Sequence, residues 1–416
     1  MNPQKKHTLP EGWEMKKLGN LALKVGSGIT PKGGRETYLS SGIPIVRSQN
    51  VVDGRLILDE VAFISEKQHQ KMKATHLRAD DLLLNITGAS IGRTCVVPSD
   101  FKEGNVNQHV CIIRLDSAKS DSNFVNAFLS CESGQKLIDS YQVGGGRQGL
   151  NFEQIKSFPI PLPPLPEQRR IAAVLGTWDT AIEQTTELLN ALRARHRGLM
   201  HQLLTGKVRL PGFGGEWKRV VLSDLFERVN RRNTEGNTNV LTISAQQGLV
   251  GQGRYFNKNV ASENLANYFL LYRGEFAYNK SYSAGYPMGA IKRLDQYDRG
   301  VLSPLYICFR MRNEAENEAK FFTHFFEAGC LNEGIGEIAQ EGARNHGLLN
   351  VGINDFFSLR IVVPCLAEQR AIAQVLDASL KEIQYWEAKL EAVREQKRGL
   401  MQCLLTGQVR VPAEVA

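Results

Sequence analysis

The sequence contains a long internal repeat, and this repeat constrains the fold more than any other feature does. Residues 160–211 align without a gap on residues 361–412, and about half of the aligned positions are identical. Glu167-Gln168-Arg169 recurs as Glu368-Gln369-Arg370. Self-similarity over this length predicts that the chain contains one structural unit twice.

Each copy of the repeat has apolar side chains at alternating steps of four and three residues, the heptad pattern of a helix that packs along another helix. Prolines from Pro159 to Pro166, and Pro364 in the second copy, limit each helix upstream, while Gly206 and Gly407 follow as helix stops. A helix over residues 167–204 would be about 57 Å long at roughly 1.5 Å per residue. The predicted seam consists of Ile171, Leu175, Trp178, Ile182, Thr185, Leu189, Leu192, His196, Leu199 and Leu203, and of Ile372, Leu376, Ser379, Ile383, Trp386, Leu390, Val393, Lys397, Leu400 and Leu404.

Some seam positions hold polar or bulky side chains that could be taken for functional sites. We interpret Thr185, His196 and Lys397 as residues that fix the register of the helices, because polar seam residues usually have that role. We interpret Trp178 and Trp386 as core residues.

A longer segment precedes each helix, at residues 1–158 and 210–359, and the helical segments occupy residues 159–209 and 360–416. Trp13 at the start of the first segment corresponds to Trp217 at the start of the second, and Asp81–Asn85 corresponds to Glu275–Asn279. Short apolar runs bounded by Gly, Asn and Pro predict an α+β fold with a mostly antiparallel sheet in each segment. The predicted strands are 43–46, 82–86, 94–97, 110–115, 240–243 and 305–311, and the predicted helices are 124–140 and 319–330.

The order of the segments predicts how the halves are related. After Gly206 the chain continues into the second globular segment, and the sequence after Gly407 resembles the sequence after Gly206. The end of the second helix would therefore lead back into the first segment if the chain were circular. We expect a pseudo-two-fold arrangement with antiparallel helices.

Composition is ordinary for a globular protein, with 42% apolar and 23% charged residues. The net charge of +8 fits a polyanionic partner without requiring one. No apolar stretch is long enough for a signal sequence or a membrane span, so we expect a cytoplasmic protein without a membrane partner. The seven cysteines are scattered singly, which predicts reduced, mostly buried thiols and no metal site.

Several short motifs, in the order in which they occur, resemble the specificity subunits of type I restriction-modification systems. They are Gly26–Pro31 followed by Gly42-Ile43-Pro44, Arg47–Asn50, Asp81–Leu84 running to Gly88–Arg93, and the Pro-rich entry into Glu-Gln-Arg at each helix. The second segment departs from this pattern, with Arg231–Thr234 and Lys280–Gly285 at the corresponding places.

The resemblance implies two tandem target-recognition domains separated by two long antiparallel coiled-coil helices. Each domain would read one half of a bipartite, asymmetric sequence in double-stranded DNA, and the helices would set the unread gap. The expected partners are two modification subunits, which carry S-adenosylmethionine and methylate adenine at N6, and two restriction subunits, which use ATP and Mg²⁺. Catalysis and cofactors are expected on these partners and not on this chain.

The sequence motifs agree with a chain that lacks catalytic activity. Gly206-Lys207 is followed by Val208 and lacks the upstream glycine of a P-loop. We find no Asn-Pro-Pro-aromatic motif of a methyltransferase and no constellation of an independent enzyme. The main alternative is a coiled-coil scaffold that binds proteins and contacts DNA without sequence preference.

Base reading requires side chains that fork onto base edges, chiefly Arg and Lys for guanine and Asn and Gln for adenine, with further contacts to phosphates. Such side chains cluster in predicted loops, although an exposed loop residue without a DNA contact is at least as common an explanation for each one. The candidates in the first segment are Lys32 and Arg35 for phosphate, and Arg47, Ser48, Gln49, Asn50, Ser90, Arg93, Arg147 and Gln148; those in the second are Ser244, Gln246, Gln247, Lys280, Ser281, Tyr282, Arg344, Asn345 and His346.

Overall fold

A computed structural model of the chain describes residues 9–30, 38–52, 54–142, 149–255, 264–341, 347 and 349–411. The chain divides into two compact units. Unit 1 comprises Met1–Thr186 and Ala388–Ala416, and unit 2 comprises Glu187–Glu387. Each unit therefore contains one globular segment and part of each long helix.

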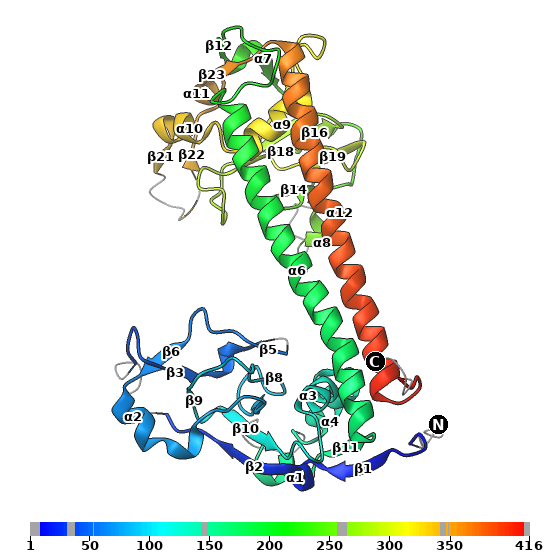
Figure 1. Cartoon of the computed structure of the whole chain (residues 1–416). Helices are drawn as coiled ribbons and strands as arrows, with labels where there is room; N and C mark the ends of the chain where they lie inside the picture. Colours follow the sequence, from blue (N-terminus) through cyan, green and yellow to red (C-terminus); the bar gives the residue numbers. More distant parts are fainter. Residues whose placement is uncertain are drawn as a thin grey trace. The chain divides into compact units, whose positions relative to one another are not determined.

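Unit 1 is built on a four-stranded antiparallel sheet in the order β2-β10-β7-β8 (Figure 1). Smaller sheets, β6-β3-β9, β4-β5 and β1-β11, surround it. Its elements are β1 Glu14–Lys17, α1 Leu18–Leu21, β2 Ala22–Ser27, β3 Ile43–Val46, β4 Val51–Val52, β5 Arg55–Leu56, β6 Ala62–Ile64, α2 Glu66–Lys71, β7 Leu82–Asn85, β8 Thr94–Val96, β9 Asn105–Val106, β10 Val110–Leu115, α3 Ser122–Ser130, α4 Glu132–Ser140, α5 Phe152–Ser157, β11 Pro159–Leu162 and the first part of α6 Leu165–Leu204.

The central strands of unit 1 are buried on both faces, which explains their continuous apolar runs. Leu82, Leu84 and Ile113 face a core that includes Phe124 of α3. Alternate residues such as Leu83 pack in a second core on the other face. The sheet thus separates α3, α4 and α5 from strands β3, β4 and β9.

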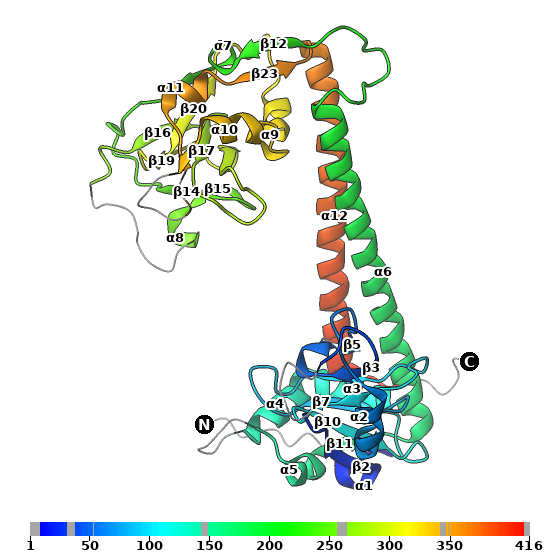
Figure 2. The same cartoon turned by 90° about the vertical axis from the view of Figure 1, so that its left-hand side faces the viewer.

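Unit 2 has a four-stranded sheet in the order β13-β20-β17-β18, with the separate pairs β12-β23, β14-β15, β16-β19 and β21-β22 (Figure 2). Its elements are the last part of α6, β12 Lys218–Val221, α7 Leu222–Leu225, β13 Phe226–Arg228, β14 Leu241–Ser244, β15 Gly248–Gly251, α8 Gln252–Tyr255, β16 Phe269–Tyr272, β17 Phe276–Asn279, β18 Ala290–Arg293, β19 Arg299–Leu302, β20 Ile307–Met311, α9 Ala319–Glu327, α10 Asn332–Ile338, β21 Gln340–Glu341, β22 Leu349–Asn350, α11 Ile353–Phe357, β23 Arg360–Val363 and the first part of α12 Leu366–Leu405.

The two four-stranded sheets have the same connectivity, which confirms the predicted α+β repeat. Leu82 of β7 pairs with Ile113 of β10, and Phe276 of β17 pairs with Phe309 of β20 at the same place in the frame. The frames differ in what is inserted before β7 and between β8 and β10 in unit 1, and before β17 and between β18 and β20 in unit 2. Unit 1 inserts a three-stranded sheet with the parallel pair β3-β9, whereas unit 2 inserts the antiparallel pairs β14-β15 and β16-β19.

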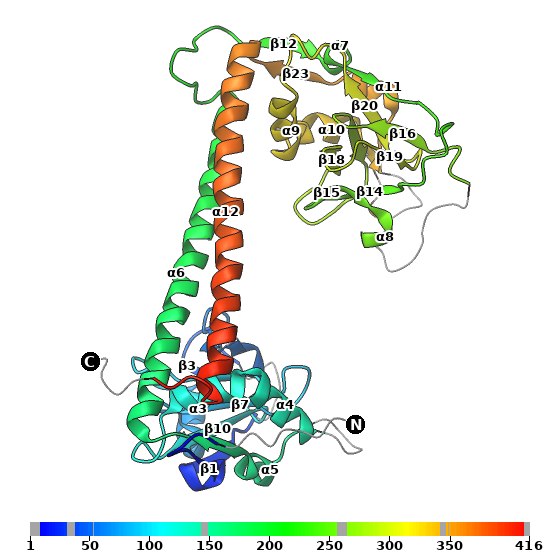
Figure 3. The same ribbon diagram turned by 90° about the vertical axis from the view of Figure 1, so that its right-hand side faces the viewer.

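The long helices α6 and α12 have 40 residues each, and all the predicted seam residues are buried or half-buried. In unit 1, Leu175 of α6 and Leu404 of α12 share one core, and in unit 2 Leu203 of α6 and Leu376 of α12 share another. Each unit therefore pairs the start of one helix with the end of the other, which confirms antiparallel packing (Figure 3).

Three helix boundaries differ from the prediction, and the ends of several strands differ by one or two residues. Helix α6 begins at Leu165 and takes Pro166 into its first turn, where a missing N–H breaks no intrahelical bond. The predicted helix over 124–140 is two helices, because Cys131 between α3 and α4 adopts an extended conformation. The predicted helix over 319–330 ends at Glu327.

The cysteines are mostly buried, as predicted. Cys95, Cys111, Cys131 and Cys308 are buried and all seven thiols are free. Burial raises the pKa of Cys95 and of Cys111 to about 12, which keeps these thiols protonated and unreactive. Among the described residues, no helix combines the length and the apolar character that crossing a membrane would require.

Candidate nucleic-acid interface

The glutamate of the repeated Glu-Gln-Arg motif joins the start of each long helix to the segment that follows the other long helix. Glu167 is buried and receives two hydrogen bonds from Arg410, from Nε at 2.6 Å and from Nη2 at 2.7 Å. Glu368 receives two bonds of 2.6 Å from Arg209 in the same way. We call each of these pairs a helix clamp. Because the same pair of hydrogen bonds forms in both units, we assign the repeated motif a structural role.

The glutamine of the motif fixes the first helix after the sheet. In unit 1 the Oε1 atom of Gln168 accepts a bond of 2.9 Å from the backbone N–H of Asp121, directly before α3. In unit 2 Gln369 accepts a bond of 2.9 Å from the N–H of Glu318, directly before α9. These bonds align Asp121 with Glu318, so the residues of α3 and α9 correspond one to one.

The candidate loop at residues 47–50 forms a short 3-10 turn that presents some side chains and buries others. Asn50 is only 3% exposed, and its amide accepts a bond from the N–H of Arg47 and donates one to the carbonyl of Ile57, both of 3.0 Å. Its amide is therefore committed to the turn. Gln49 is exposed, Ser48 is half-buried, and the half-buried Arg47 guanidinium lies 5.5 Å from the centre of the Tyr38 ring.

The candidate loop after β7 lies beside this turn. The amide of Asn85 donates to the carbonyl of Ser48 at 2.9 Å and to the hydroxyl of Ser90 at 3.2 Å. Arg93 at the end of the loop is exposed. The structure thus brings the Arg47–Asn50 and Ser90–Arg93 candidates together at one edge of the central sheet.

Four candidates of unit 1 lie outside the described residues: Lys32, Arg35, Arg147 and Gln148. The described residue after the last of them, Gly149, pairs with Thr87 at the start of the loop after β7.

The Gly26–Pro31 motif has a structural explanation, since a Cβ on Gly28 would come within 1.6 Å of the carbonyl oxygen of Val106.

Unit 2 has an equivalent loop after β17. The N–H of Tyr282 donates to the carbonyl of Gly347 at 2.8 Å, and the N–H of Leu349 donates to the carbonyl of Lys280 at 3.0 Å. The Tyr282 side chain is 63% exposed, and the N–H of Ser281 is held by Asn279. The candidates Arg344, Asn345 and His346 lie outside the described residues.

The remaining candidates of unit 2 are at the turn between β14 and β15. Ser244 is buried, and its hydroxyl accepts a bond of 3.2 Å from the N–H of Gln247. Gln246 and Gln247 are exposed. The turn therefore offers two glutamine amides to a partner, while Ser244 shapes the backbone.

Unit 1 also contains a polar cleft that was not predicted from the sequence. It has a volume of about 1060 Å³ and lies between the globular segment and the two long helices of the unit. Arg93 is the one sequence candidate that lines it. The other basic side chains along it are Arg55, Arg169, Arg394, Lys397 and Arg398. Arginines repeated along a helix are usual on solvated faces, so no sequence pattern singled out these side chains.

The first half of the chain matches a known family. A model described as "Type I restriction modification DNA specificity domain" matches residues 10–194. A putative type I restriction enzyme MjaX specificity subunit of Methanocaldococcus jannaschii is 23% identical, over 97% of this chain and 95% of its own length. The chain is therefore similar, over nearly its whole length, to type I restriction enzyme specificity subunits. The MjaVIII specificity subunit of the same organism, a second such subunit, is also 23% identical, over 97% of this chain and 94% of its own length.

Solved structures have the same fold as this chain. A structure described under complex assembly and conformational transition of the type I R-M system gives a TM-score of 0.58 at 16% identity, and covers 97% of this chain and 100% of its own. The type I restriction-modification S subunit from M. genitalium gives a TM-score of 0.56 at 15% identity, and covers 97% of this chain and 98% of its own.

Proposed function

We propose that this chain is the non-catalytic subunit that gives a type I restriction-modification complex its DNA sequence specificity. Each unit would read one half of a bipartite, asymmetric target in double-stranded DNA. The observation that carries this proposal is a shared frame with different insertions: β2-β10-β7-β8 and β13-β20-β17-β18 have the same connectivity, but the segments inserted into them differ. Such a repeat can hold two different reading surfaces on one scaffold.

The candidate loops fit this proposal because they belong to the inserted segments and to the loop after the central strand. Arg47, Gln49 and Arg93 are available in unit 1, and Gln246 and Gln247 in unit 2. These are the residue types that form paired hydrogen bonds with guanine and adenine. The two sets differ, as an asymmetric target requires.

The proposed partners follow from the family that the chain resembles. Two modification subunits would bind S-adenosylmethionine and methylate adenine at N6, and two restriction subunits would use ATP and Mg²⁺ to translocate and cut DNA. Helices α6 and α12 would set the length of the unread gap between the half-sites.

An exchange of one globular segment tests the proposal. Residues 18–158 would be replaced by the corresponding segment of a type I specificity subunit, which leaves Trp13, β1 and the clamp between Glu167 and Arg410 in place. The variant would be expressed in cells with the modification and restriction subunits, and methylated sites would be mapped by long-read sequencing. We expect one half-site to change while the other half-site and the gap remain.

The reciprocal exchange of residues 222–359 is the control, and it should change the other half-site. If either exchange altered both half-sites, the units would not read DNA separately. Methylation without any sequence preference in the unaltered complex would refute the specificity function and favour the scaffold.

A further inference from the structure

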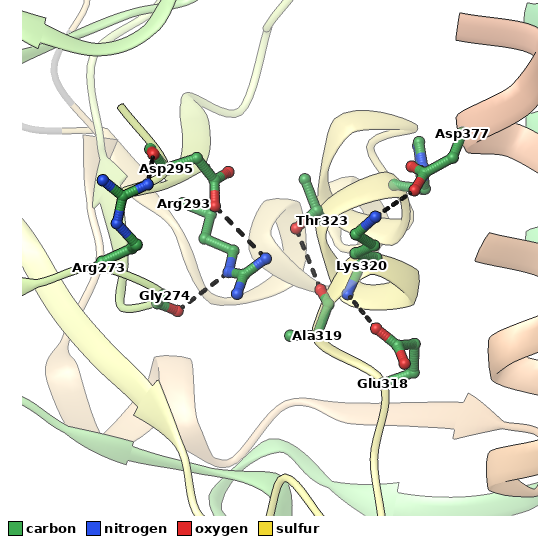
Figure 4. Close-up of polar contacts among 10 residues, drawn as sticks. Arg273, Gly274, Arg293, Asp295, Glu318, Ala319, Lys320, Thr323 and Asp377 are labelled. Carbon is green, nitrogen blue, oxygen red and sulfur yellow. Dashed lines mark hydrogen bonds and ion pairs between the residues drawn. The ribbon is translucent and has the colours of Figure 1, made fainter. Parts of the chain in front are cut away.

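The two units join the globular segment to the long helices in different ways. In unit 2, Asp377 of α12 connects to α9 through His324 Nε2 at 2.9 Å. It also connects through Lys320 Nζ at 2.7 Å, the contact that Figure 4 shows. We call this pair of contacts the brace. It closes the space between α9 and the helix pair of unit 2.

Unit 1 has no side chains at the equivalent positions that could form such a brace. The bonds from Gln168 and Gln369 align α3 with α9, so Asn123 corresponds to Lys320 and Ala127 corresponds to His324. In the helical repeat, Gly176 corresponds to Asp377. Short side chains at these positions leave open the cleft of about 1060 Å³.

The charge of this cleft is predominantly positive. Six basic side chains line it, against three acidic ones, Asp121, Asp179 and Glu391. Arg93 and Arg169 are both exposed, and neither has an ion-pair partner among the residues that the structure describes. Two guanidinium groups from opposite walls are thus available to an anion.

The other basic groups of the cleft are in ion pairs that a stronger anion can replace. Arg55 and Glu183 are 3.1 Å apart, and their side chains are 49% and 54% exposed. Arg398 pairs with Glu391 at 3.0 Å, again between exposed side chains. Exposed pairs of this kind contribute little to stability, so exchanging the carboxylate for a phosphate costs little.

We propose that this cleft of unit 1 binds the phosphate backbone of double-stranded DNA beside the first half-site. The inference rests on the proposed function, because Arg93 belongs both to the candidate reading loop and to the cleft. Long, exposed Arg side chains suit phosphate contacts, which position DNA without reading its sequence. Gly176 permits a close approach at the helix, since a Cβ there would meet nothing within 4 Å.

Among the residues that the structure describes, the unit 2 counterparts of these groups make other contacts. Arg370, the repeat counterpart of Arg169, lies 3.7 Å from Glu318, and Arg193, the counterpart of Arg394, is paired with Glu387. The brace occupies the equivalent space. Backbone contacts are therefore concentrated on one half of the protein.

The first test compares Arg169→Gln with its repeat counterpart Arg370→Gln in the full-length chain. Binding to fluorescent duplexes of about 40 base pairs would be measured over a series of salt concentrations. We expect Arg169→Gln to reduce the slope of log K against log salt by about 1, whatever the sequence of the duplex. Arg370→Gln should leave the slope unchanged, and an equal loss in both variants would overturn the proposal.

The second test transfers the brace into unit 1. The double variant Asn123→Lys with Gly176→Asp should close the cleft and weaken DNA binding, while Gly176→Ala serves as the matched control. Circular dichroism would confirm that both variants are folded. If the double variant bound DNA like the unaltered chain, the cleft would not be the binding site.

Two different duplexes distinguish a failure of this inference from a failure of the proposed function. One carries the sequence found by methylation mapping and the other carries the same bases in scrambled order. A preference for the mapped sequence with an unchanged salt slope in Arg169→Gln refutes the cleft alone. No preference in the unaltered chain refutes the proposed reading of DNA.

Discussion

Units 1 and 2 share a frame of strands and helices but fill it with different side chains. At equivalent places in the central sheet, unit 1 pairs Leu82 with Ile113, whereas unit 2 pairs Phe276 with Phe309, whose rings stack at 5.4 Å. Unit 2 adds further aromatic rings from α9, such as Phe322 and Phe326. The comparison shows that strand order is retained while the core between the strands and helices is repacked.

The clamps and the brace are distributed differently between the two units. Both units have a buried glutamate bound by an arginine from the segment after a long helix, but only unit 2, among the parts that the structure describes, has a brace like that of Asp377. The clamp that attaches the long helices is therefore common to both units, whereas the brace beside them is described in unit 2 alone.

The largest expected effect comes from the repacked cores. Phe309 is fully buried, and Phe309→Ala should lower the free energy of unfolding of unit 2 by about 3–5 kcal/mol, because it leaves a cavity. Ile113→Ala should cost unit 1 about 2–5 kcal/mol for the same reason. Hydrogen exchange measured by mass spectrometry would follow the two units separately.

Each core variant should lose protection mainly in its own unit. Leu305→Ala is the control, because the Leu305 side chain is 71% exposed and its removal should change neither unit. An equal loss of protection in both units from either core variant would show that they unfold as one.

A smaller effect is expected from the clamps. Arg410→Ala and Arg209→Ala each leave a buried carboxylate without its main partner, so both should lower the thermal midpoint. The loss should be larger for Arg410→Ala, because Trp217 Nε1 still donates to Glu368 at 3.3 Å, whereas Trp13 Nε1 has no hydrogen-bond partner among the described residues. Differential scanning calorimetry would measure both midpoints.

The conservative variant Arg410→Lys tests whether geometry or charge matters in the clamp. A lysine keeps the charge but cannot form two parallel bonds, so it should recover only part of the lost midpoint. Full recovery by lysine would mean that the paired geometry contributes nothing.

The smallest effect is a dependence on pH that should be confined to unit 2. Burial lowers the pKa of His196 below its usual value of 6.5, and the neighbouring His324 lowers it further, while Glu327 opposes the shift. The unfolded chain therefore binds the proton more tightly than the folded chain, so stability is present above about pH 6.5 and declines as the pH falls through the lowered pKa. The equivalent position in unit 1 holds no histidine but Lys397, which is paired with Asp179.

Hydrogen exchange at about pH 7.5 and about pH 5.5 checks this dependence. Unit 2 should lose protection at the lower pH, and His196→Gln should reduce the difference. A greater loss in unit 1 than in unit 2 would contradict the assignment.

The repeat and the helices could be predicted because heptad spacing is a local pattern. Strand positions such as Val110–Leu115 were also visible as apolar runs. The order of the strands depends on pairing between distant residues, and the break at Cys131 depends on how α4 packs on α3, where a Cβ on Gly134 would come within 2.0 Å of the carbonyl oxygen of Phe128. Neither the strand order nor this break can be predicted from local composition.

The candidate site was harder to predict for the same reason. Asn50 and Ser244 have the right chemistry for DNA, but the fold uses their side chains to hold turns. Arg169 lies on a helix and Arg93 follows a strand, and only the tertiary structure brings them to one cleft. The sequence identifies groups capable of binding, while the fold decides which of them are accessible.

The clamp between Glu167 and Arg410 has a consequence for how the protein is made. Ribosomes synthesise Glu187–Glu387 before Ala388, so all of unit 2 exists while unit 1 still lacks its second helical segment. During that interval Leu175 has no Leu404 to pack against, and an apolar stripe of the nascent chain is open to chaperones and proteases. The unit that starts first during translation is therefore the last to be completed.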